Sequence, residues 1–378
     1  MKRFFYIITI LVLSVSASSG QNRKSESKES SFQNNSFYPV TSYNHEFKKK
    51  KPRNVILMIG DGMSIPQIYA GLTANKGNLY LGNFRHAGFS KTYSANKYIT
   101  DSGAGGTAIA TGHKTNNSSI GVDSENRPVP SVIEIARANG MATGIVVTTS
   151  ILDATPAAFI AHVPNRNMSD DIAVSFTENG PDVFIGGGIE HFKNRGDKRD
   201  LLAELSAKQY QVCDTITEVV KIKSGKLAGF LTENRVDKRG DQLPVTTGIA
   251  LDILDDHKKG FFLVVEGSEI DGGGHENDMK YTIEEMLDFD RAVGKALDFA
   301  SRDGHTLVVV TADHETGGLT LVDGDILSGK VTGRFSTSGH TALMVPVFAY
   351  GPGAEIFGGI DDNTAFFNKF IKLLNLKH

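Results

Sequence analysis

The 378-residue sequence predicts an α/β fold, with a doubly wound, mainly parallel central sheet and helices on both faces. Two observations support this prediction. Short, continuous apolar runs recur from residue 54 onward, as expected for strands that a parallel sheet buries on both faces. Helix-like segments separate these runs, and such an alternation is typical of doubly wound sheets.

Six apolar runs, most of them bounded by glycine, are the predicted strands. They cover residues 55–60, 144–149, 183–188, 261–267, 306–311 and 345–351. Between them, residues 132–139 and 283–300 are predicted helices. The second helix has apolar residues at Ile283, Met286, Leu287, Ala292, Ala296 and Leu297.

Residues 1–20 have the layout of a secretory signal peptide. Lys2 and Arg3 precede an apolar run at residues 4–15, and small residues follow it. This run is shorter than the about 20 apolar residues that a membrane span needs. We therefore expect an exported protein, periplasmic or secreted, whose mature chain has no transmembrane segment.

The rest of the chain is predicted to contain a linker and one domain. Residues 21–52 are rich in Ser, Asn, Lys and Glu, which predicts a flexible polar linker, and residues 53–378 form the domain. Cys213 is the one cysteine, which excludes an intramolecular disulfide. A net charge of −3 gives no field that attracts nucleic acid, so nucleic acid is not expected as a specific partner.

Polar side chains stand where four predicted strands end. They are Asp61 after the first run, Asp153 and Thr155 after the second, Glu266 at the end of the fourth, and Asp313 and His314 after the fifth. Ligands of open α/β sheets bind at the carboxyl ends of the strands, so these residues should converge. Each one alone also fits a turn or capping residue, but together they favour a metal site.

The segment from Glu266 to His275 adds Asp271 and three consecutive glycines. If Asp271 opens a helical turn, it faces the same way as His275, four residues later. Mixed Asp and His donors suit zinc, whereas oxygen donors alone suit magnesium. A plain flexible glycine loop is the alternative interpretation of this segment.

Two further residues have the chemistry to act on a phosphate group. Ser102 begins a run of small residues, and the N-terminus of a helix there would direct N–H groups at an oxyanion. Ser102 is then either an ordinary helix cap or a metal-activated nucleophile. Arg166 is either a surface residue or a clamp that binds two phosphate oxygens at once.

Seven motifs, in order along the chain, resemble those of the alkaline phosphatase family. They are NVILMIGDGM at residues 54–63, TDS at 100–102, DATPAA at 153–158, AHVPNR at 161–166, VEG at 265–267 with Asp271 and His275 after it, TADHETGG at 311–318 and GHT at 339–341. The resemblance covers the chain from Asn54 to near the C-terminus. It implies an alkaline phosphatase-like fold and a single catalytic domain over residues 53–378.

The resemblance also implies two zinc ions and one magnesium ion. The ligands of one zinc would be Asp271, His275 and His340. The ligands of the other zinc, which would also hold the Ser102 oxygen, would be Asp61, Asp313 and His314. The ligands of magnesium would be Asp61, Thr155 and Glu266, with Asp153 in or beside the shell.

The implied reaction is the hydrolysis of small-molecule phosphate monoesters through a phosphoserine intermediate at Ser102. Arg166 would clamp the phosphate, and inorganic phosphate and an alcohol would be released. Gly272 departs from the family pattern, because relatives often carry lysine or histidine there, and weaker product binding is expected. Asp153 replaces the histidine of some relatives, which favours magnesium at the third site.

The oligomeric state and three rival functions stay open at this point. The resemblance implies a homodimer, but residues 318–340 are too short for the surface domain that decorates many animal relatives. The rivals are a phosphodiesterase or sulfatase of the wider superfamily, and a non-catalytic phosphate- or metal-binding protein. Ser102 lacks the C/S-x-P-x-R context of a sulfatase, Arg166 suits a dianionic monoester, and every expected ligand is present.

Overall fold

The structure is a computed structural model that describes residues 29–44, 47, 51–193, 195–233 and 235–378. The predicted signal peptide, residues 1–20, lies outside the described residues. Within the described residues, no helix has the length and apolar character needed to cross a membrane.

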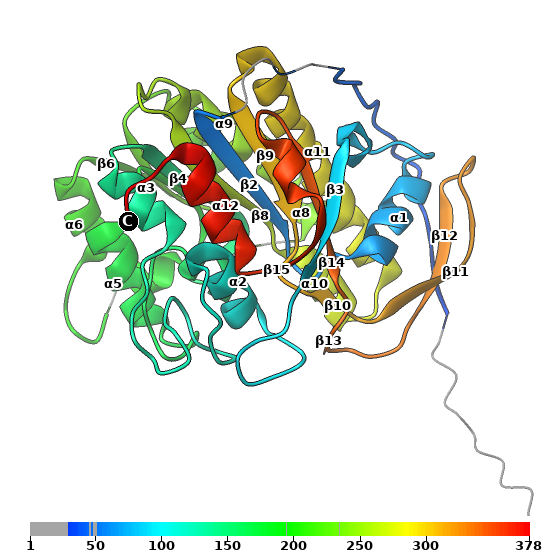
Figure 1. The fold of residues 1–378 in the computed structure, drawn as a ribbon, viewed down its shortest axis with the longest axis horizontal. Helices are drawn as coiled ribbons and strands as arrows, with labels where there is room; N and C mark the ends of the chain where they lie inside the picture. Colours follow the sequence, from blue (N-terminus) through cyan, green and yellow to red (C-terminus); the bar gives the residue numbers. More distant parts are fainter. Residues whose placement is uncertain (1–28, 45–46, 48–50, 194, 234) are drawn as a thin grey trace, which may run out of the picture.

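A ten-stranded sheet forms the centre of the fold (Figure 1). Its strands are β2 (Asn54–Gly60), β3 (His86–Lys91), β4 (Ala142–Ser150), β5 (Val183–Gly187), β6 (Tyr210–Cys213), β7 (Lys226–Phe230), β8 (Phe261–Gly267), β9 (Thr306–Thr311), β14 (Val345–Tyr350) and β15 (Gly359–Asp362). They follow the order β15-β3-β14-β9-β2-β8-β4-β5-β7-β6. Strand β14 runs antiparallel to both of its neighbours, and the other pairs are parallel, so the predicted fold class is confirmed.

Helices cover both faces of this sheet. On one face lie α1 (Ile65–Ala74), α9 (Gln242–Asp255) and α11 (Met279–Asp303), and on the other α2 (Ser102–Thr111), α3 (Val132–Ala138), α5 (Ser169–Asn179), α6 (Leu201–Ala207) and α12 (Ala365–Leu374). Alternate residues of β2 divide between the two cores: Ile56 and Met58 pack under α11, while Leu57 packs on the opposite side. Because β2 is buried on both faces, its sequence is a continuous apolar run.

All six predicted strands and both predicted helices are present. Helix α11 begins four residues before the predicted start, because the side chain of Asp278 caps it by accepting from the backbone N–H groups of Lys280 and Tyr281. It ends at Asp303 and is capped by Gly304, which has a φ of 67°. Strands β3, β6, β7 and β15 were not predicted. Strand β3 has an alternating burial pattern near the edge of the sheet, so its sequence lacks a continuous apolar run.

The prediction that all of residues 21–52 form a flexible linker is wrong for the described part. Residues Ser30–Gln33 form β1, which pairs antiparallel with β12 (Lys330–Phe335), and β12 in turn pairs with β11 (Leu319–Asp325). Further along, the Tyr38 hydroxyl donates to Asp290 of α11 at 2.7 Å. The polar composition of residues 21–52 does not indicate these contacts, because they depend on backbone pairing and on two aromatic residues, Phe32 and Tyr38.

A buried ion-pair cluster joins α8 (Val236–Arg239) to α11. Arg239 Nη2 lies 2.6 Å from Glu285 Oε2 and 2.7 Å from Asp288 Oδ2, and all three side chains are at most 1% exposed. Burial raises the pKa of both carboxyls, and Arg239 opposes that rise. Loss of Arg239 would leave Glu285 without this cation and Asp288 dependent on Arg291, which lies 2.9 Å from it.

We expect Arg239→Met to lower the free energy of unfolding by about 3–5 kcal/mol, because two buried carboxylates lose their shared cation. Urea unfolding followed by circular dichroism measures this loss. The control is Arg302→Met, which breaks an exposed pair with Asp298 and should cost at most about 1 kcal/mol. Equal losses in the two variants would contradict the interpretation.

Candidate active site

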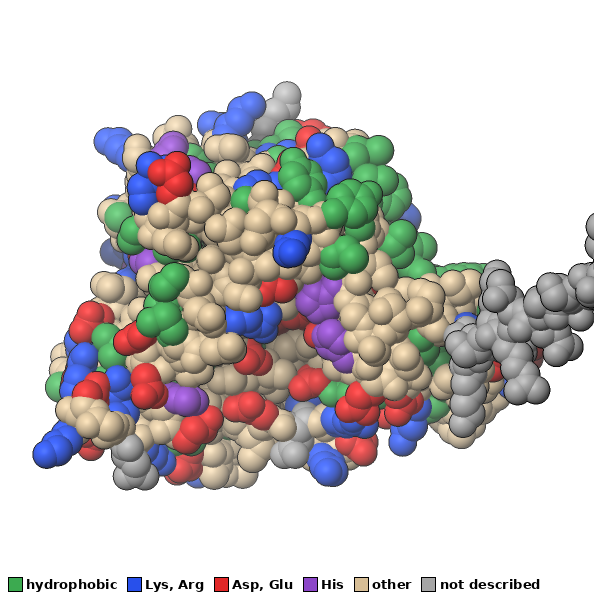
Figure 2. Space-filling view, turned by 90° about the horizontal axis from the view of Figure 1, so that it is seen from below, with side chains coloured by type: hydrophobic (Ala, Val, Ile, Leu, Met, Phe, Trp, Pro, Cys, Tyr) green, Lys and Arg blue, Asp and Glu red, His purple; other side chains and the backbone are tan. Residues whose placement is uncertain are grey.

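The polar residues predicted at the strand ends converge at one end of the sheet. Figure 2 shows this end of the molecule, where histidine, acidic and basic side chains gather around a recess. A cavity of about 160 Å³ opens there, and its lining includes Asp61, Ser102, Asp153, Thr155, Arg166, Glu266 and Asp271. The expected convergence is therefore present in the structure.

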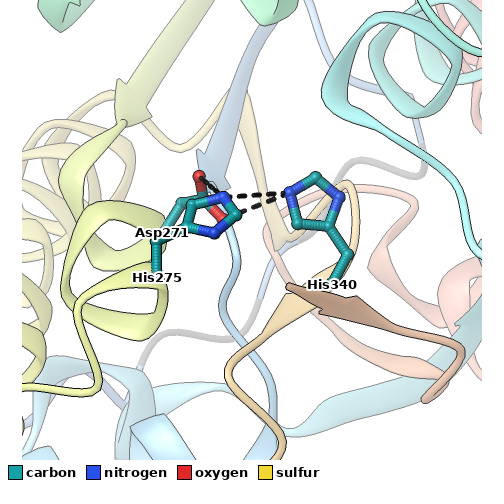
Figure 3. A group of neighbouring side chains, drawn as sticks. All are labelled: Asp271, His275 and His340. Carbon is teal, nitrogen blue, oxygen red and sulfur yellow. Dashed lines mark hydrogen bonds and ion pairs between the residues drawn. The ribbon is translucent and has the colours of Figure 1, made fainter. Parts of the chain in front are cut away.

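Asp271, His275 and His340 form the first of two clusters that could hold a metal (Figure 3). Asp271 and His275 come from α10 (Glu269–His275), one helical turn apart, and His340 comes from β13 (His340–Thr341). His275 Nε2 lies 3.1 Å from Asp271 Oδ2 and 3.2 Å from His340 Nε2. The three ligand atoms thus point at one another.

Backbone carbonyls fix the orientation of both imidazole rings in this cluster. His275 Nδ1 donates to the carbonyl of Ser338 at 2.6 Å, and His340 Nδ1 donates to the carbonyl of Thr100 at 2.9 Å. Because carbonyls only accept, each ring directs its Nε2 into the cluster, as metal-binding histidines usually do. The hydrogen bond that His275 donates to the Asp271 carboxylate raises the pKa of His275 to about 9. Burial alone would raise the pKa of Asp271, but His275 and the other histidines hold it below its usual value.

Asp61, Asp313 and His314 form the second cluster, and all three are buried. His314 Nε2 lies 3.4 Å from Asp61 Oδ1, 3.3 Å from Asp313 Oδ2 and 3.2 Å from the hydroxyl of Ser102. Within the described residues, neither of those two carboxylate oxygens has a hydrogen-bond partner. Buried acceptors without a partner are costly, and a cation among them would remove that cost.

Oxygen donors beside the second cluster form a third group. Thr155 Oγ1 lies 3.4 Å from Asp61 Oδ2, and Asp153 precedes the short helix α4 (Ala154–Ala157), which carries Thr155. Glu266 is buried at the end of β8 and accepts from the hydroxyl of Ser268 at 2.8 Å. This group has the carboxylate and hydroxyl oxygens that magnesium prefers.

Burial raises the pKa of the carboxyls at the centre of the site, and neighbouring carboxylates add to the effect. The pKa of Glu266 rises to about 8 and that of Asp313 to about 7. Burial, followed by repulsion from Asp313, raises the pKa of Asp61 well above its usual value. Burial also lowers the pKa of His314 well below its usual value. These side chains therefore gather more negative charge than the protein compensates, which fits divalent cations.

Ser102 is the first residue of α2, and the helix is capped by its neighbour. Asp101 Oδ1 accepts from the backbone N–H of Ala104 at 3.0 Å, so the Ser102 hydroxyl is not used as a cap. Small residues let α2 approach the metal clusters closely: a Cβ at position 105 would lie 3.0 Å from the carbonyl oxygen of Asp313. Arg166 Nη1 lies 3.5 Å from Asp101 Oδ2, which directs the guanidinium beside Ser102.

Sequence reasoning missed several residues of the site. Thr316 donates to Asp271 and lies 3.2 Å from His314 Nδ1, so it joins the two clusters. Glu269 also lines the cavity and accepts from the Tyr281 hydroxyl. Thr316 lies inside the TADHETGG motif, so the family resemblance could have indicated it. The contact between Glu269 and Tyr281 could not be predicted in this way, because it depends on how α10 packs on α11.

Comparisons with known proteins place this chain in a family. The family model described as alkaline phosphatase matches residues 52–332. Alkaline phosphatase 4 of Bacillus subtilis is 36% identical, over 86% of this chain and 89% of that protein. The structure of alkaline phosphatase from the Antarctic bacterium TAB5 is similar with a TM-score of 0.83 and 42% identity, over 87% of this chain and all of that one.

A variant of the Antarctic enzyme, in which aspartate replaces a histidine, is similar to the same degree. Its TM-score is 0.83 at 41% identity, over 88% of this chain and all of that one, and it has magnesium bound in its M3 site. The family match and the identities confirm phosphomonoester hydrolysis over the rival functions that the sequence left open. From its sequence and its fold, the chain belongs to the alkaline phosphatase family.

Proposed function

We propose that the chain hydrolyses phosphate monoesters through a phosphoserine at Ser102, with two zinc ions and one magnesium ion as cofactors. The position of the Ser102 hydroxyl is the observation that carries the proposal. It lies 3.2 Å from His314 Nε2, in the cluster that contains two buried carboxylate oxygens lacking hydrogen-bond partners among the described residues. A hydroxyl at the edge of a metal cluster is placed to act as a nucleophile.

The residues of the three groups fit the proposed ions. One zinc would be held by Asp271, His275 and His340, and the other by Asp61, Asp313 and His314. Magnesium would be held by Asp61, Thr155 and Glu266, with Asp153 beside them. Mixed nitrogen and oxygen donors suit zinc, and the relative with magnesium in its M3 site supports an oxygen-rich third site. When bound, the ions would offset the charge on the attacking and leaving oxygens.

The protein itself positions the reacting groups. Ser102 Oγ would attack phosphorus, forming an Oγ–P bond while the bond to the substrate alcohol breaks and the alcohol leaves with a proton. Water would then attack the phosphoserine, release inorganic phosphate and return the hydroxyl to Ser102. Arg166 would bind two phosphoryl oxygens throughout, and the N-terminus of α2 would direct its dipole at them.

Trapping the intermediate tests this proposal. The purified enzyme is quenched with acid during turnover of p-nitrophenyl phosphate, digested and analysed by mass spectrometry. A phosphate group is expected on the peptide that contains Ser102, and it should be absent in Ser102→Ala. Phosphate on a different residue of the active enzyme would contradict the proposal.

Gly272 gives a second prediction, which the structure constrains. A Cβ at position 272 would lie 2.3 Å from Glu269 Oε2 and 2.7 Å from the Tyr281 hydroxyl oxygen, so a lysine there requires both side chains to shift, and the test removes both groups. In a Glu269→Ala/Tyr281→Phe background, we expect Gly272→Lys to strengthen inhibition by inorganic phosphate, because it adds a cation near the product. The background variant alone is the control, and equal inhibition constants would contradict the expected role.

We also propose that residues 53–378 act as one catalytic domain, which the single large sheet supports. We propose that the chain is exported, to the periplasm or the medium, after cleavage of residues 1–20. N-terminal sequencing of the mature protein tests this, and an intact Met1 would contradict it.

A homodimer is the proposed oligomeric state. Ile65 and Tyr69 on α1, together with Leu343 and Met344, are large apolar residues exposed to solvent. Ser64 Oγ lies 3.5 Å from the carbonyl of Met344, so the two segments that carry these residues are neighbours. Sedimentation velocity should give a dimer, and Tyr69→Arg should shift it to monomer.

A further inference from the structure

We propose that His162 is a positioning residue that holds the segment carrying Arg166 in place for phosphate binding. The inference rests on the phosphate-clamp role proposed for Arg166. His162 lies four residues before Arg166 in the AHVPNR motif, and it contributes no atom to the cavity lining. Any effect on the reaction must therefore pass through the backbone that joins them.

The segment that carries Arg166 is paired with another loop. Ile120 and Val163 exchange two backbone hydrogen bonds of 2.9 Å, and the Arg166 N–H donates to the carbonyl of Ser118 at 2.7 Å. Residues 163–166 thus run antiparallel to residues 118–120. The position of the Arg166 backbone depends on this short ladder.

His162 holds, through two hydrogen bonds, the end of the ladder that lies farthest from Arg166. Its Nδ1 lies 2.6 Å from the carbonyl oxygen of Gly121, and its Nε2 lies 3.0 Å from Glu134 Oε1. A carbonyl and a carboxylate both accept, so both ring nitrogens donate and the ring is an imidazolium. The Glu134 hydrogen bond, opposed in part by burial, raises the pKa of His162, in agreement with that charge.

Both partners of His162 are themselves fixed. Glu134 also accepts from the backbone N–H of Ser131 at 2.7 Å, which completes the capping box of α3. Gly121 has a φ of 58°, and a Cβ there would lie 2.0 Å from the carbonyl oxygen of Ala161, so glycine allows the two loops to approach. The Gly121 N–H donates to Thr107 of α2 at 3.0 Å. His162 therefore connects the ladder to α3, while Gly121 connects it to the helix of Ser102.

The other end of the ladder meets Asp101, next to Ser102. Asp101 Oδ2 accepts from the backbone N–H of Ser118 at 2.9 Å and lies 3.5 Å from Arg166 Nη1. One end is thus fixed by an ion pair on α3 and the other by the residue that caps α2. Loss of the His162 contacts would release the end of the ladder remote from Asp101, so that the backbone carrying Arg166 could shift, and small displacements of a positioning group are costly to catalysis.

A double-mutant cycle between His162 and Arg166 tests the inference. His162→Asn keeps an amide donor near Gly121 and removes the bond to Glu134. We expect it to lower kcat/KM for p-nitrophenyl phosphate by about 10-fold and to raise the inhibition constant of inorganic phosphate by a similar factor. In the Arg166→Ala background, the same change should alter both values by less than about 2-fold, because its effect passes through the clamp.

Equal effects of His162→Asn in the two backgrounds, or no effect in the parent, would overturn the inference. The matched control is His191→Asn, which removes another histidine–carboxylate contact, 2.9 Å from Asp170, outside the ladder. It should leave both values near the parent's. If His162→Asn fails to fold, Glu134→Gln enters the same cycle with the same expected pattern. Hydrolysis of p-nitrophenyl phosphate by the parent tests the proposed function on its own. If the parent is active, a failed cycle counts against the role of His162 alone.

Discussion

Replacing Ser102 with alanine is expected to lower kcat for p-nitrophenyl phosphate by about 10³-fold or more, while the protein stays folded and keeps its metal ions. Alanine has no oxygen to accept the phosphoryl group. Stability should be nearly unchanged, because Asp101 rather than Ser102 caps α2 and alanine favours a helix. Initial rates and thermal unfolding of the two proteins measure both statements.

A matched control separates the loss of the nucleophile from the loss of any helical serine. Ser175 lies in α5, where its hydroxyl donates to the carbonyl of Asp171 at 3.1 Å. Ser175→Ala should keep the parent rate. If Ser102→Ala kept that rate too, the attacking oxygen would have to come from elsewhere, and the phosphoserine mechanism would be wrong.

Asp313→Asn is expected to produce the second large effect. With metal present it should weaken zinc binding and activity, and without metal it should raise the stability of the fold. Asp313 Oδ1 accepts from the backbone N–H groups of Gly62 and His314, and an amide oxygen can do the same, so the fold should persist. The lost charge should weaken zinc binding at the second cluster by at least about 100-fold and lower kcat accordingly. Zinc content after dialysis and initial rates measure these losses.

Without metal, the same substitution should stabilise the protein. The folded pKa of Asp313 is raised to about 7, so the unfolded state, with its lower pKa, releases the proton first. The metal-free parent therefore loses stability as pH rises from about 4 through 7, and the amide in Asp313→Asn, which does not titrate, cannot contribute to that loss. At pH 8, metal-free Asp313→Asn should have a higher Tm than the metal-free parent. A lower Tm would mean that the buried carboxylate is compensated within the protein.

The sequence was sufficient to predict six strands of the central sheet that are buried on both faces, but it missed the short buried strand β7 and the strands at or near the edges. Runs such as β2 and β8 are apolar throughout because helices cover both of their sides. Strand β3 alternates buried and exposed residues, and β1 has the polar sequence SSFQ, so neither has a distinctive pattern. Such strands are determined by pairing with distant residues, for example Ser31 with Thr332.

The sequence predicted which residues form the candidate site better than it predicted how they are arranged in space. Strand ends indicated Asp61, Glu266 and Asp313, because the end of a parallel sheet gathers whatever follows its strands. His340 carried no such signal: it lies on β13, a two-residue strand that, among the residues the structure describes, pairs with β10 (Glu315–Thr316) alone. Its assignment came from family resemblance. The packing of Glu269 and Tyr281 around Gly272 depends on two helices and could not be read from spacing.

Removal and replacement of metal tests the central claim most directly. The purified chain is stripped with a chelator and assayed on p-nitrophenyl phosphate at alkaline pH, then refilled with zinc, with magnesium or with both. Activity should vanish on chelation and return fully with both metals, at two zinc ions and one magnesium ion per chain. Turnover that survives complete chelation, or a refilled and folded chain that stays inactive, would contradict the account.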